Sequence, residues 1–180
     1  MADGPRYHVA MRRRRENRTD YRRRLALLKA RKPRLVVRKK TANLIVQLVG
    51  YDAQGDVVLA QAQARELSGF GWTGAAKNTP AAYLVGYLAG RRAAATGVKE
   101  AVLDIGRQIP SKGGRIFAAL QGVLDAGIDV PHGNDVLPDA ARVKGEHIDD
   151  LAEGVFAATK AKIESGKPNS KPATTGGASR

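Results

Sequence analysis

Short runs rich in β-branched residues follow one another in the first half of the chain. The runs RLVVR (34–38), NLIVQLVG (43–50) and VVLAQAQA (57–64) each have the length and composition of a β-strand. The segment YDAQGD (51–56) is rich in turn formers, so the second and third runs are predicted to form a hairpin. Together the three runs predict an antiparallel meander.

The apolar positions then change to helical spacing. Thr79 is predicted as the N-cap of a helix, with Pro80 at its first position and Gly97 at its end. The run AVLDI (101–105) predicts a buried strand, and a second helix is predicted over about 115–126. The resulting order βββαβα predicts an α/β fold, in which helices pack on a mixed sheet as an α/β sandwich.

Both ends of the chain carry weaker patterns. Tyr21, Leu25 and Leu28 recur at helical spacing and predict one helix over about 12–31, which Pro33 stops. A C-terminal helix is predicted over about 147–164, and its mixed faces indicate packing at the edge of the core or on a partner.

We therefore expect four parts along the chain. They are a basic arm (1–31), an α/β core domain (32–135), a C-terminal helical extension (136–165) and a tail (166–180). The tail consists of Ser, Gly, Pro, Thr and Lys without apolar periodicity, so it is expected to be disordered.

Charge adds a functional constraint to this picture. The chain carries 31 Lys and Arg against 17 Asp and Glu, a formal net charge of +14. Residues 1–40 hold sixteen of the bases and three of the acids, a net +13, so the remaining residues are nearly neutral. This asymmetry indicates a polyanionic partner, either nucleic acid or an anionic membrane. A charge run that serves only solubility is the weaker alternative, because a near-neutral domain does not need one.

The membrane alternative is disfavoured by the apolar residues. A helix lying on a membrane needs a wide apolar face, and Tyr21, Leu25 and Leu28 are too few. No apolar run approaches the roughly 20 residues of a spanning helix, and the N-terminus has charge where a signal peptide is apolar. The chain has no cysteine, which excludes disulfides and thiolate metal sites. A soluble, intracellular protein without a membrane partner is expected.

Arginine outnumbers lysine twelve to four in residues 1–40, which favours RNA. Guanidinium groups bind phosphate oxygens through two parallel hydrogen bonds and stack on bases. Like charges would weaken the arm helix in water, so we expect it to become ordered only against RNA phosphates. The residues of this segment that are predicted to bind RNA are Arg12, Arg13, Arg14, Arg15, Arg18, Arg22, Arg23, Arg24, Arg31, Lys32, Arg34, Arg38, Lys39 and Lys40.

Two loops add candidate RNA ligands. LSGFGWTGAAKN (67–78) lacks the spacing of a phosphate-binding loop, but its aromatics look exposed, so Trp72 and Lys77 are candidates for contact with a nucleotide. Packing of Phe70 and Trp72 in the core is the alternative. In GRQIPSKGG (106–114), Arg107 and Lys112 precede a helix start at which Arg115 follows two glycines, a suitable place for a phosphate. A simple turn into the helix is the alternative there.

The sequence shows no catalytic set. Asp104 ends a predicted strand, as a carboxylate of a metal-dependent nuclease would, but no second or third acid accompanies it. A capping role in the following loop is more usual for such a residue. His8, His132 and His147 lack the spacing of metal ligands. No enzyme activity, metal or cofactor is expected.

Three separated blocks resemble a known family. They are KPRLVVRKKTANLIVQLV (32–49), NTPAAYLVGYLAGRRAAATGV (78–98) and AVLDIGRQIPSKGGRIFAALQGVLDAGIDVPH (101–132). In this order they resemble the universal 5S-rRNA-binding protein of the large ribosomal subunit, the eighteenth in the large-subunit series. The Arg-rich leader fits the same pattern, and the resemblance covers about residues 5–150.

Details of the sequence are similar to the archaeal branch of this family. The segment ARVKGEHI (141–148) and the longer linker at 65–78 are shared with that branch. The loop at 109–112 departs from the bacterial pattern, because Ile, Pro, Ser and Lys stand where that pattern has aromatic residues and histidine.

The resemblance implies an α/β sandwich and a structural role in the cytoplasmic large ribosomal subunit. The implied partners are 5S rRNA, large-subunit rRNA and neighbouring ribosomal proteins of the central protuberance, where the family anchors 5S rRNA. Two alternatives remain from the residues alone. A general nucleic-acid-binding or DNA-compacting protein would bind duplex DNA and 5S rRNA similarly, and a nuclease using Asp104 would cleave RNA with a divalent metal.

Overall fold

The computed structural model of the chain describes residue 4 and residues 7–148 and 154–166. Its centre is a four-stranded sheet in the order β3-β2-β1-β4. The strands are β1 (Arg34–Lys39), β2 (Leu44–Gly50), β3 (Val57–Gln63) and β4 (Val102–Asp104). β2 is antiparallel to both β1 and β3, whereas β4 runs parallel to β1. The predicted meander and mixed sheet are therefore confirmed.

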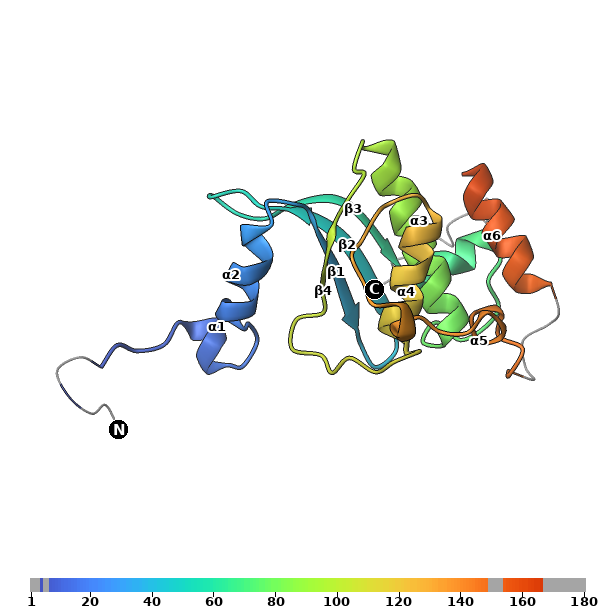
Figure 1. Cartoon of the computed structure of the whole chain (residues 1–180). Helices are drawn as coiled ribbons and strands as arrows, with labels where there is room; N and C mark the ends of the chain where they lie inside the picture. The colour runs from blue at the N-terminus through green and yellow to red at the C-terminus, as the bar shows by residue number, and fades with distance from the viewer. Residues whose placement is uncertain (1–3, 5–6, 149–153, 167–180) are drawn as a thin grey trace, which may run out of the picture.

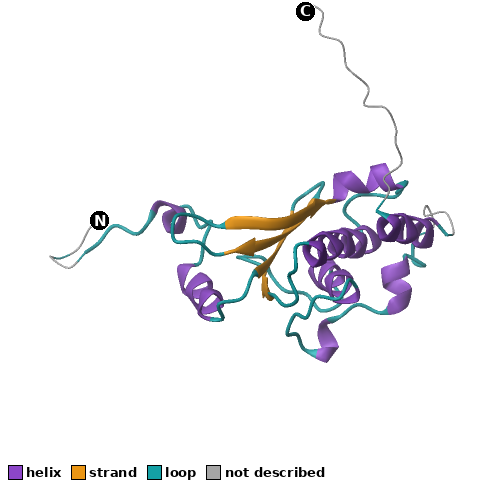
Figure 2. Ribbon diagram, turned by 90° about the horizontal axis from the view of Figure 1, so that it is seen from above, coloured by secondary structure: helices purple, strands orange, loops and turns teal. Residues whose placement is uncertain are grey.

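Helices cover one face of this sheet. The long helices α3 (Thr79–Ala95) and α4 (Arg115–Asp125) pack against each other and against the strands, as Figures 1 and 2 show. The short α5 (Ala140–Lys144) and α6 (Val155–Ser165) lie beyond α3. The predicted α/β class is confirmed.

The N-terminal helices lie on the other side of the sheet. They are α1 (Arg12–Arg15) and α2 (Tyr21–Lys29), and in both views the sheet separates them from α3 and α4 (Figures 1 and 2). Two 3-10 helices, Ala64–Phe70 and Asn134–Val136, complete the elements of the described residues. The sheet thus has one face for the core and one face toward the basic arm.

The core lies between the sheet and the long helices. Leu35 and Val37 of β1, with Leu44, Val46 and Leu48 of β2, are at most 2% exposed. Because successive strand side chains point to opposite faces, these alternate residues all meet α3 and α4. Arg34, Val36 and Arg38, which alternate with them on β1, are left on the face toward the arm.

Glycines allow α3 and α4 to approach closely. A Cβ atom added at Gly86 of α3 would overlap the backbone carbonyl of Ala119, and one at Gly122 of α4 would overlap that of Tyr83. No side chain could move to relieve either overlap, because the obstructing atoms belong to the backbone. The two helices therefore pack backbone against backbone at this crossing.

Helix α6 packs on α3 through a polar and aromatic cluster. The Tyr83 hydroxyl lies 2.5 Å from Asp125 Oδ2, and Lys160 of α6 donates to the same hydroxyl at 2.9 Å. The Lys160 ammonium also lies 5.1 Å from the centre of the Tyr87 ring, and the Tyr87 hydroxyl donates to Glu164. Burial and the Asp125 carboxylate both raise the pKa of Tyr83, so its hydroxyl stays protonated. The predicted packing of the C-terminal helix at the edge of the core is confirmed.

The ends of α3 lie close to where the sequence predicts them, but its N-cap is a different residue. The N-cap of α3 is Asn78, whose Oδ1 accepts the Ala81 N–H at 2.9 Å. The prediction of Thr79 as N-cap is wrong, because Thr79 is already helical and its neighbour Asn78 supplies the capping oxygen. Gly97 follows the last turn with a φ of 83°, as predicted for a helix end.

The predicted single helix over 12–31 is also wrong. Asn17 has a φ of 54°, which ends the first helical turn. Asp20 then caps a new helix, because its side chain accepts the N–H groups of Arg22 and Arg23. Leu25 of the expected apolar stripe is 58% exposed, whereas Tyr21 and Leu28 are half-buried, so only part of that stripe is covered.

The predicted C-terminal helix over 147–164 is only partly present. His147 lies in a turn that follows α5, a short helix that the sequence analysis missed. Helix α6 begins at Val155, and residues 149–153 lie outside the described residues. The expected disordered tail lies outside them too, apart from Gly166, which follows α6.

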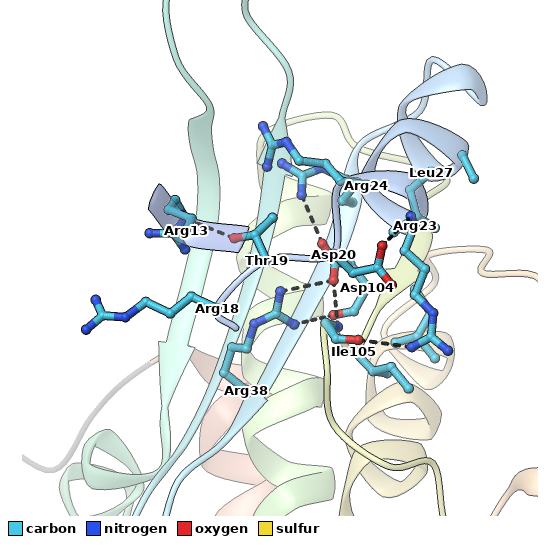
Figure 3. Close-up of a pocket in the computed structure, with 14 residues that line it drawn as sticks. Arg13, Arg18, Thr19, Asp20, Arg23, Arg24, Leu27, Arg38, Asp104 and Ile105 are labelled. Atoms are coloured by element: carbon cyan, nitrogen blue, oxygen red, sulfur yellow. Dashed lines mark hydrogen bonds and ion pairs between the residues drawn. The ribbon is translucent and has the colours of Figure 1, made fainter. Parts of the chain in front are cut away.

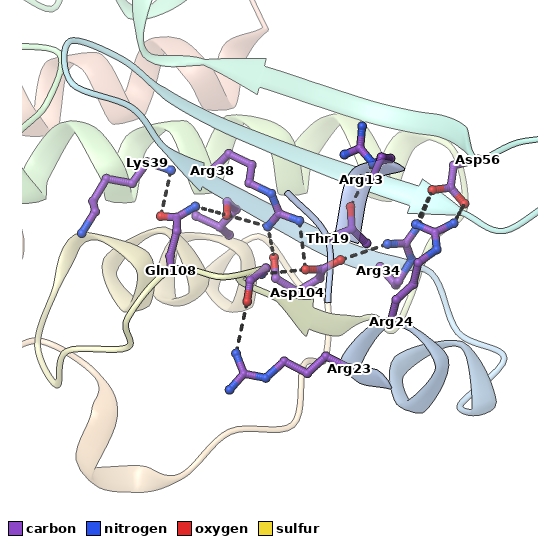
Figure 4. Close-up of polar contacts among 12 residues, drawn as sticks. Arg13, Thr19, Arg23, Arg24, Arg34, Arg38, Lys39, Asp56, Asp104 and Gln108 are labelled. Carbon is purple, nitrogen blue, oxygen red and sulfur yellow. Dashed lines mark hydrogen bonds and ion pairs between the residues drawn. The ribbon is translucent and has the colours of Figure 1, made fainter. Parts of the chain in front are cut away.

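A chain of ion pairs crosses the arm-facing side of the sheet. Arg34 of β1 is 3% exposed, and its guanidinium donates to Asp104 Oδ2 at 2.9 Å and to Asp56 Oδ2 at 2.7 Å. Arg38 binds the other oxygen of Asp104 at 3.0 Å (Figure 3). Arg24 of α2 forms two hydrogen bonds to Asp56, at 2.9 and 3.0 Å (Figure 4). The network Arg38–Asp104–Arg34–Asp56–Arg24 joins β4, β1, the β2–β3 hairpin and α2.

The arginines of this network keep both carboxylates ionised. Burial alone would raise the pKa of Asp104, but the charge and hydrogen bond of Arg38, the Gly106 N–H and Arg34 outweigh it and lower the pKa. Burial also raises the pKa of Asp56, but the hydrogen bonds from Arg24 and Arg34 outweigh it, so the pKa is lowered. Asp104 also accepts the Gly106 N–H at 2.8 Å, which confirms its predicted capping role in the loop.

The close crossing of α3 and α4 gives a first prediction. Gly86→Ala should lower the free energy of unfolding by about 2–3 kcal/mol, because the helices must separate to admit the methyl group. Urea unfolding followed by circular dichroism measures this change. Gly133→Ala is the control, since its added Cβ meets no atom within 4 Å, and it should change stability by less than about 0.5 kcal/mol. Equal stability of the two variants would contradict the described packing.

The ion-pair network gives a second prediction. Asp104→Asn should destabilise the protein by about 3 kcal/mol at pH 7, because it leaves the buried Arg34 with one counter-ion. In wild type, the ionised Asp104 contributes to stability above its pKa in the unfolded chain, about 3.9. This contribution is lost as the pH falls through its lower pKa in the folded protein. Urea unfolding at several pH values should therefore show the difference shrinking below about pH 4.

The exposed Asp139→Asn is the matched control for this measurement. It removes the same charge outside the network and should change stability by less than about 0.5 kcal/mol at either pH. A difference between Asp104→Asn and wild type that is independent of pH would argue against the role assigned to the carboxylate.

Candidate nucleic-acid interface

The arginines of α1 point into solvent. Arg12, Arg13, Arg14 and Arg15 are all exposed, and so is the following Arg18. Glu16 forms the ion pairs of this segment, with Arg18 at 3.0 Å and Arg12 at 3.9 Å. A single carboxylate among these cations leaves a strong positive potential on α1, as expected for a surface that binds a polyanion.

Helix α2 is attached to the domain by two arginines. Arg24 is paired with Asp56 on the β2–β3 hairpin, and Arg23 Nη1 donates to the Gly106 carbonyl at 3.1 Å, beyond the end of β4. Leu27 and Leu28 are half-buried. These contacts supply stabilisation that an isolated helix lacks. Ordering of the arm on RNA stays a prediction, and it fits α1 better than α2.

A cleft of about 380 Å³ separates the arm from the sheet. Figure 3 shows arginines of the arm and Arg38 of β1 among the residues that line it. The acids that line it are Asp20, which caps α2, and Asp104, which is held by Arg34 and Arg38. The arginines that line it are Arg13, Arg18, Arg23, Arg24, Arg34 and Arg38. Its excess of guanidinium groups suits a phosphate or a phosphodiester segment.

The two arginines of β1 are less available than the sequence indicates. The prediction that Arg34 binds RNA is wrong, because its guanidinium is buried and both Nη atoms bind carboxylates. Arg38 is partly exposed, but it donates to the Asp104 carboxylate and to the backbone carbonyls of Val37 and Asp104. A run of basic residues can thus contain structural ion pairs that local sequence does not reveal.

The other predicted ligands of the arm and its junction lie on the surface. Arg14, Arg15, Arg22 and Arg31 are exposed. Lys32 is half-buried and binds Glu100 at 2.6 Å.

A second group of cations gathers where β1 ends. Lys39 and Lys40 from the end of β1 and the turn after it, Lys77 from the loop before α3, and Arg115 at the start of α4 line one open pocket. Arg115 Nη1 donates to the Lys77 carbonyl at 2.9 Å, which joins the starts of the two long helices. The structure therefore brings together four predicted ligands from three separate segments.

The predicted RNA ligands of the loop over 107–115 lie in different places. Lys112 is exposed and pairs with Asp135 at 3.2 Å, whereas Arg115 joins the pocket with Lys77. Arg107 is exposed. The expectation that Lys112 and Arg115 act together at the start of α4 is therefore not supported by their positions.

Gln108 holds this loop against β1 and was missed by the sequence analysis. Its Oε1 accepts the Lys39 N–H at 3.1 Å, and its Nε2 donates to the Val37 carbonyl at 3.2 Å (Figure 4). An isolated glutamine in a polar loop carries no local signal of this role. The contact fixes the backbone on which Lys39 stands.

Trp72 does not belong to the interface. It is 6% exposed, lies in the hydrophobic core and directs its indole N–H to the Ala75 carbonyl at 3.4 Å. Phe70 is buried as well, so the expectation of two exposed aromatics is wrong and the core alternative is correct. Phe70 is the last residue of the 3-10 helix Ala64–Phe70, and Trp72 follows it after Gly71, whose φ is 87°.

Catalytic and membrane alternatives find no support in the described residues. Within residues 7–148 and 154–166, no group of three or more His, Cys, Asp or Glu side chains is placed to hold a metal ion. Asp104 is instead surrounded by arginines. None of the helices described is long and apolar enough to cross a membrane.

Comparison with known proteins shows the family of the chain. Residues 5–100 match the family model described as ribosomal large subunit proteins 60S L5 and 50S L18. The chain is 58% identical over 153 residues to the large ribosomal subunit protein uL18 of Korarchaeum cryptofilum, covering 85% of this chain and 78% of the relative.

Two further relatives carry the same name. The uL18 protein of Methanococcoides burtonii is 51% identical over 168 residues, which cover 91% of this chain and 97% of the relative. That of Halobacterium salinarum is 52% identical over 155 residues, which cover 86% and 85%. With a basic arm, an α/β core and these relatives, the chain belongs to the L5e/L18 family of large-ribosomal-subunit proteins, in its archaeal uL18 form.

Proposed function

We propose that this protein binds 5S rRNA and anchors it to large-subunit rRNA in the central protuberance of the ribosome. Family membership makes the chain a non-enzymatic constituent of the large subunit in the cytoplasm, which confirms the non-enzyme prediction. The choice of 5S rRNA rests on the resemblance of its sequence blocks to the 5S-binding family. Neighbouring ribosomal proteins of the central protuberance are proposed as its further partners.

The observation that best supports RNA binding is the arginine cleft beside an arm of exposed arginines. Arg13, Arg18 and Arg23 line the cleft outside the ion-pair network, and α1 adds Arg12, Arg14 and Arg15 beyond the cleft. Such a surface binds phosphates strongly, while the fixed geometry of α2 restricts which backbone path fits. RNA of defined shape is thus a better partner than an arbitrary polyanion.

Several cations beyond the arm are neutralised by carboxylates of the domain. Lys32, Arg38 and Arg92 each pair with a carboxylate, as does the buried Arg34. A DNA-compacting protein relies on many free cations spread over its surface. The concentration of unpaired arginines on one arm therefore favours a localised contact with a folded RNA.

Removal of the arm gives the prediction that tests this proposal. A chain lacking residues 1–31 should remain folded by circular dichroism, since β1 to α4 form their own core. It should bind 5S rRNA far more weakly, and the slope of log affinity against log salt should fall by several units, because eleven basic residues are lost. Filter binding at several salt concentrations measures both quantities.

Duplex DNA of the same length is the control ligand. The full-length protein should prefer 5S rRNA to this duplex by at least about tenfold at physiological salt, since shape contributes beyond charge. Equal affinity for the two would support the general nucleic-acid-binding alternative. Unchanged affinity for 5S rRNA after removal of the arm would refute the role of the arm itself.

A further inference from the structure

The pocket at the end of β1 has the composition of an anion site. Its cations are Lys39, Lys40, Lys77 and Arg115, and Thr41 and Asn78 add polar groups. No carboxylate lines it, and its volume is about 660 Å³. It is open to solvent, so an extended ligand can enter without displacing part of the fold.

These four cations differ from the ion-paired cations of the domain. Arg24, Lys32, Arg34, Arg38 and Arg92 each lie within 4.0 Å of a carboxylate oxygen. Within the ranges that the structure describes, no such ion pair involves any cation of the pocket. Placing four like charges around one hollow is unfavourable in the absence of a counter-charge, which an external anion would supply.

The backbone beneath the pocket is held in place. The Lys39 N–H donates to Gln108, and the Lys40 N–H donates to the Asn43 carbonyl at 2.8 Å. Arg115 is tied to the Lys77 carbonyl, and Asn78 uses Oδ1 to cap α3, which leaves its amide NH₂ to donate. The cationic side chains thus extend from fixed points, so little ordering of the chain is needed on binding.

The pocket and the arginine cleft serve different faces of the sheet. Arg38 and Lys39 are neighbours on β1, so their side chains point to opposite faces. Arg38 lines the cleft on the arm side, while Lys39 lines the pocket toward the starts of α3 and α4. The residues that line the two sites do not overlap. One short segment of RNA backbone cannot occupy both faces.

We propose that the pocket of Lys39, Lys40, Lys77 and Arg115 binds the phosphodiester backbone of a second RNA segment, separate from the segment held by the arm. This inference rests on the proposed function for the class of ligand. Several lysines around an open hollow suit successive phosphates, because an ammonium binds as a point charge without demanding one orientation. The protein then joins two backbone segments through two faces of one sheet.

The test uses three full-length variants. Lys40→Ala/Lys77→Ala alters the pocket at exposed side chains, and Arg14→Ala/Arg22→Ala alters the exposed face of the arm. The matched control is Arg91→Ala/Lys99→Ala, which removes two exposed cations at the other end of α3. Arg91 lies 12 residues along α3 from Thr79, which is about 18 Å along the helix axis, and Lys99 lies beyond the end of the helix.

Hydroxyl-radical footprinting of each variant on purified 5S rRNA and large-subunit rRNA is the central readout. The pocket variant should lose protection of one RNA segment that the arm variant still protects. The arm variant should lose protection of a second segment that the pocket variant still protects. For the pocket variant, the slope of log affinity against log salt should fall by about two, one unit for each lost cation. The control variant should change neither footprint.

Two results would overturn the proposal. One is loss of the same protected segment in the pocket and arm variants, and the other is a pocket variant with the footprint and salt slope of the control. The second result would leave the pocket available for an acidic protein segment instead. A wild-type protein that protects neither RNA would refute the proposed function itself, which is a separate outcome.

Discussion

The burial of Arg34 between two carboxylates is the interaction on which the arrangement of this protein depends. A guanidinium at 3% exposure is tolerated only when its charge is compensated by nearby anions. Asp104 supplies one carboxylate from β4 and Asp56 supplies the other from the β2–β3 hairpin. Asp56 also binds Arg24 of α2. The carboxylate that neutralises Arg34 therefore determines where α2 lies as well.

This constraint divides the basic residues into two functional groups. Arginines of the network are used to join strands and to attach α2, so they contribute shape. The exposed arginines of α1 and the cations of the pocket beyond β1 lie outside this network, and we propose that they bind phosphates. A strongly basic protein of the ribosome can in this way remain folded and still present unneutralised charge to RNA.

The sequence predicts the strands and helices better than it predicts which charged side chains form structural ion pairs. The four strands and the two long helices were identifiable because their signals are local: β-branched runs, Gly97 and Gly127 at helix ends, and turn formers between strands. The role of Arg34 was not, because its partner Asp104 lies 70 positions away and local sequence shows only another arginine beside a basic arm. Trp72 was misassigned for a different reason, because the glycine-rich sequence around it gives no sign that its ring packs in the hydrophobic core.

Hydrogen exchange on the protein alone tests most directly whether the network fixes the arm. In wild type the amides of α2 should be protected, while those around α1 exchange rapidly, because only α2 is tied to the hairpin. Arg24→Ala should accelerate exchange in α2 by about tenfold, the loss of about 1.4 kcal/mol from a charge-assisted pair, and leave α3 unchanged, because Asp56 still pairs with the buried Arg34. Exchange in α2 that is the same in both proteins would contradict the account.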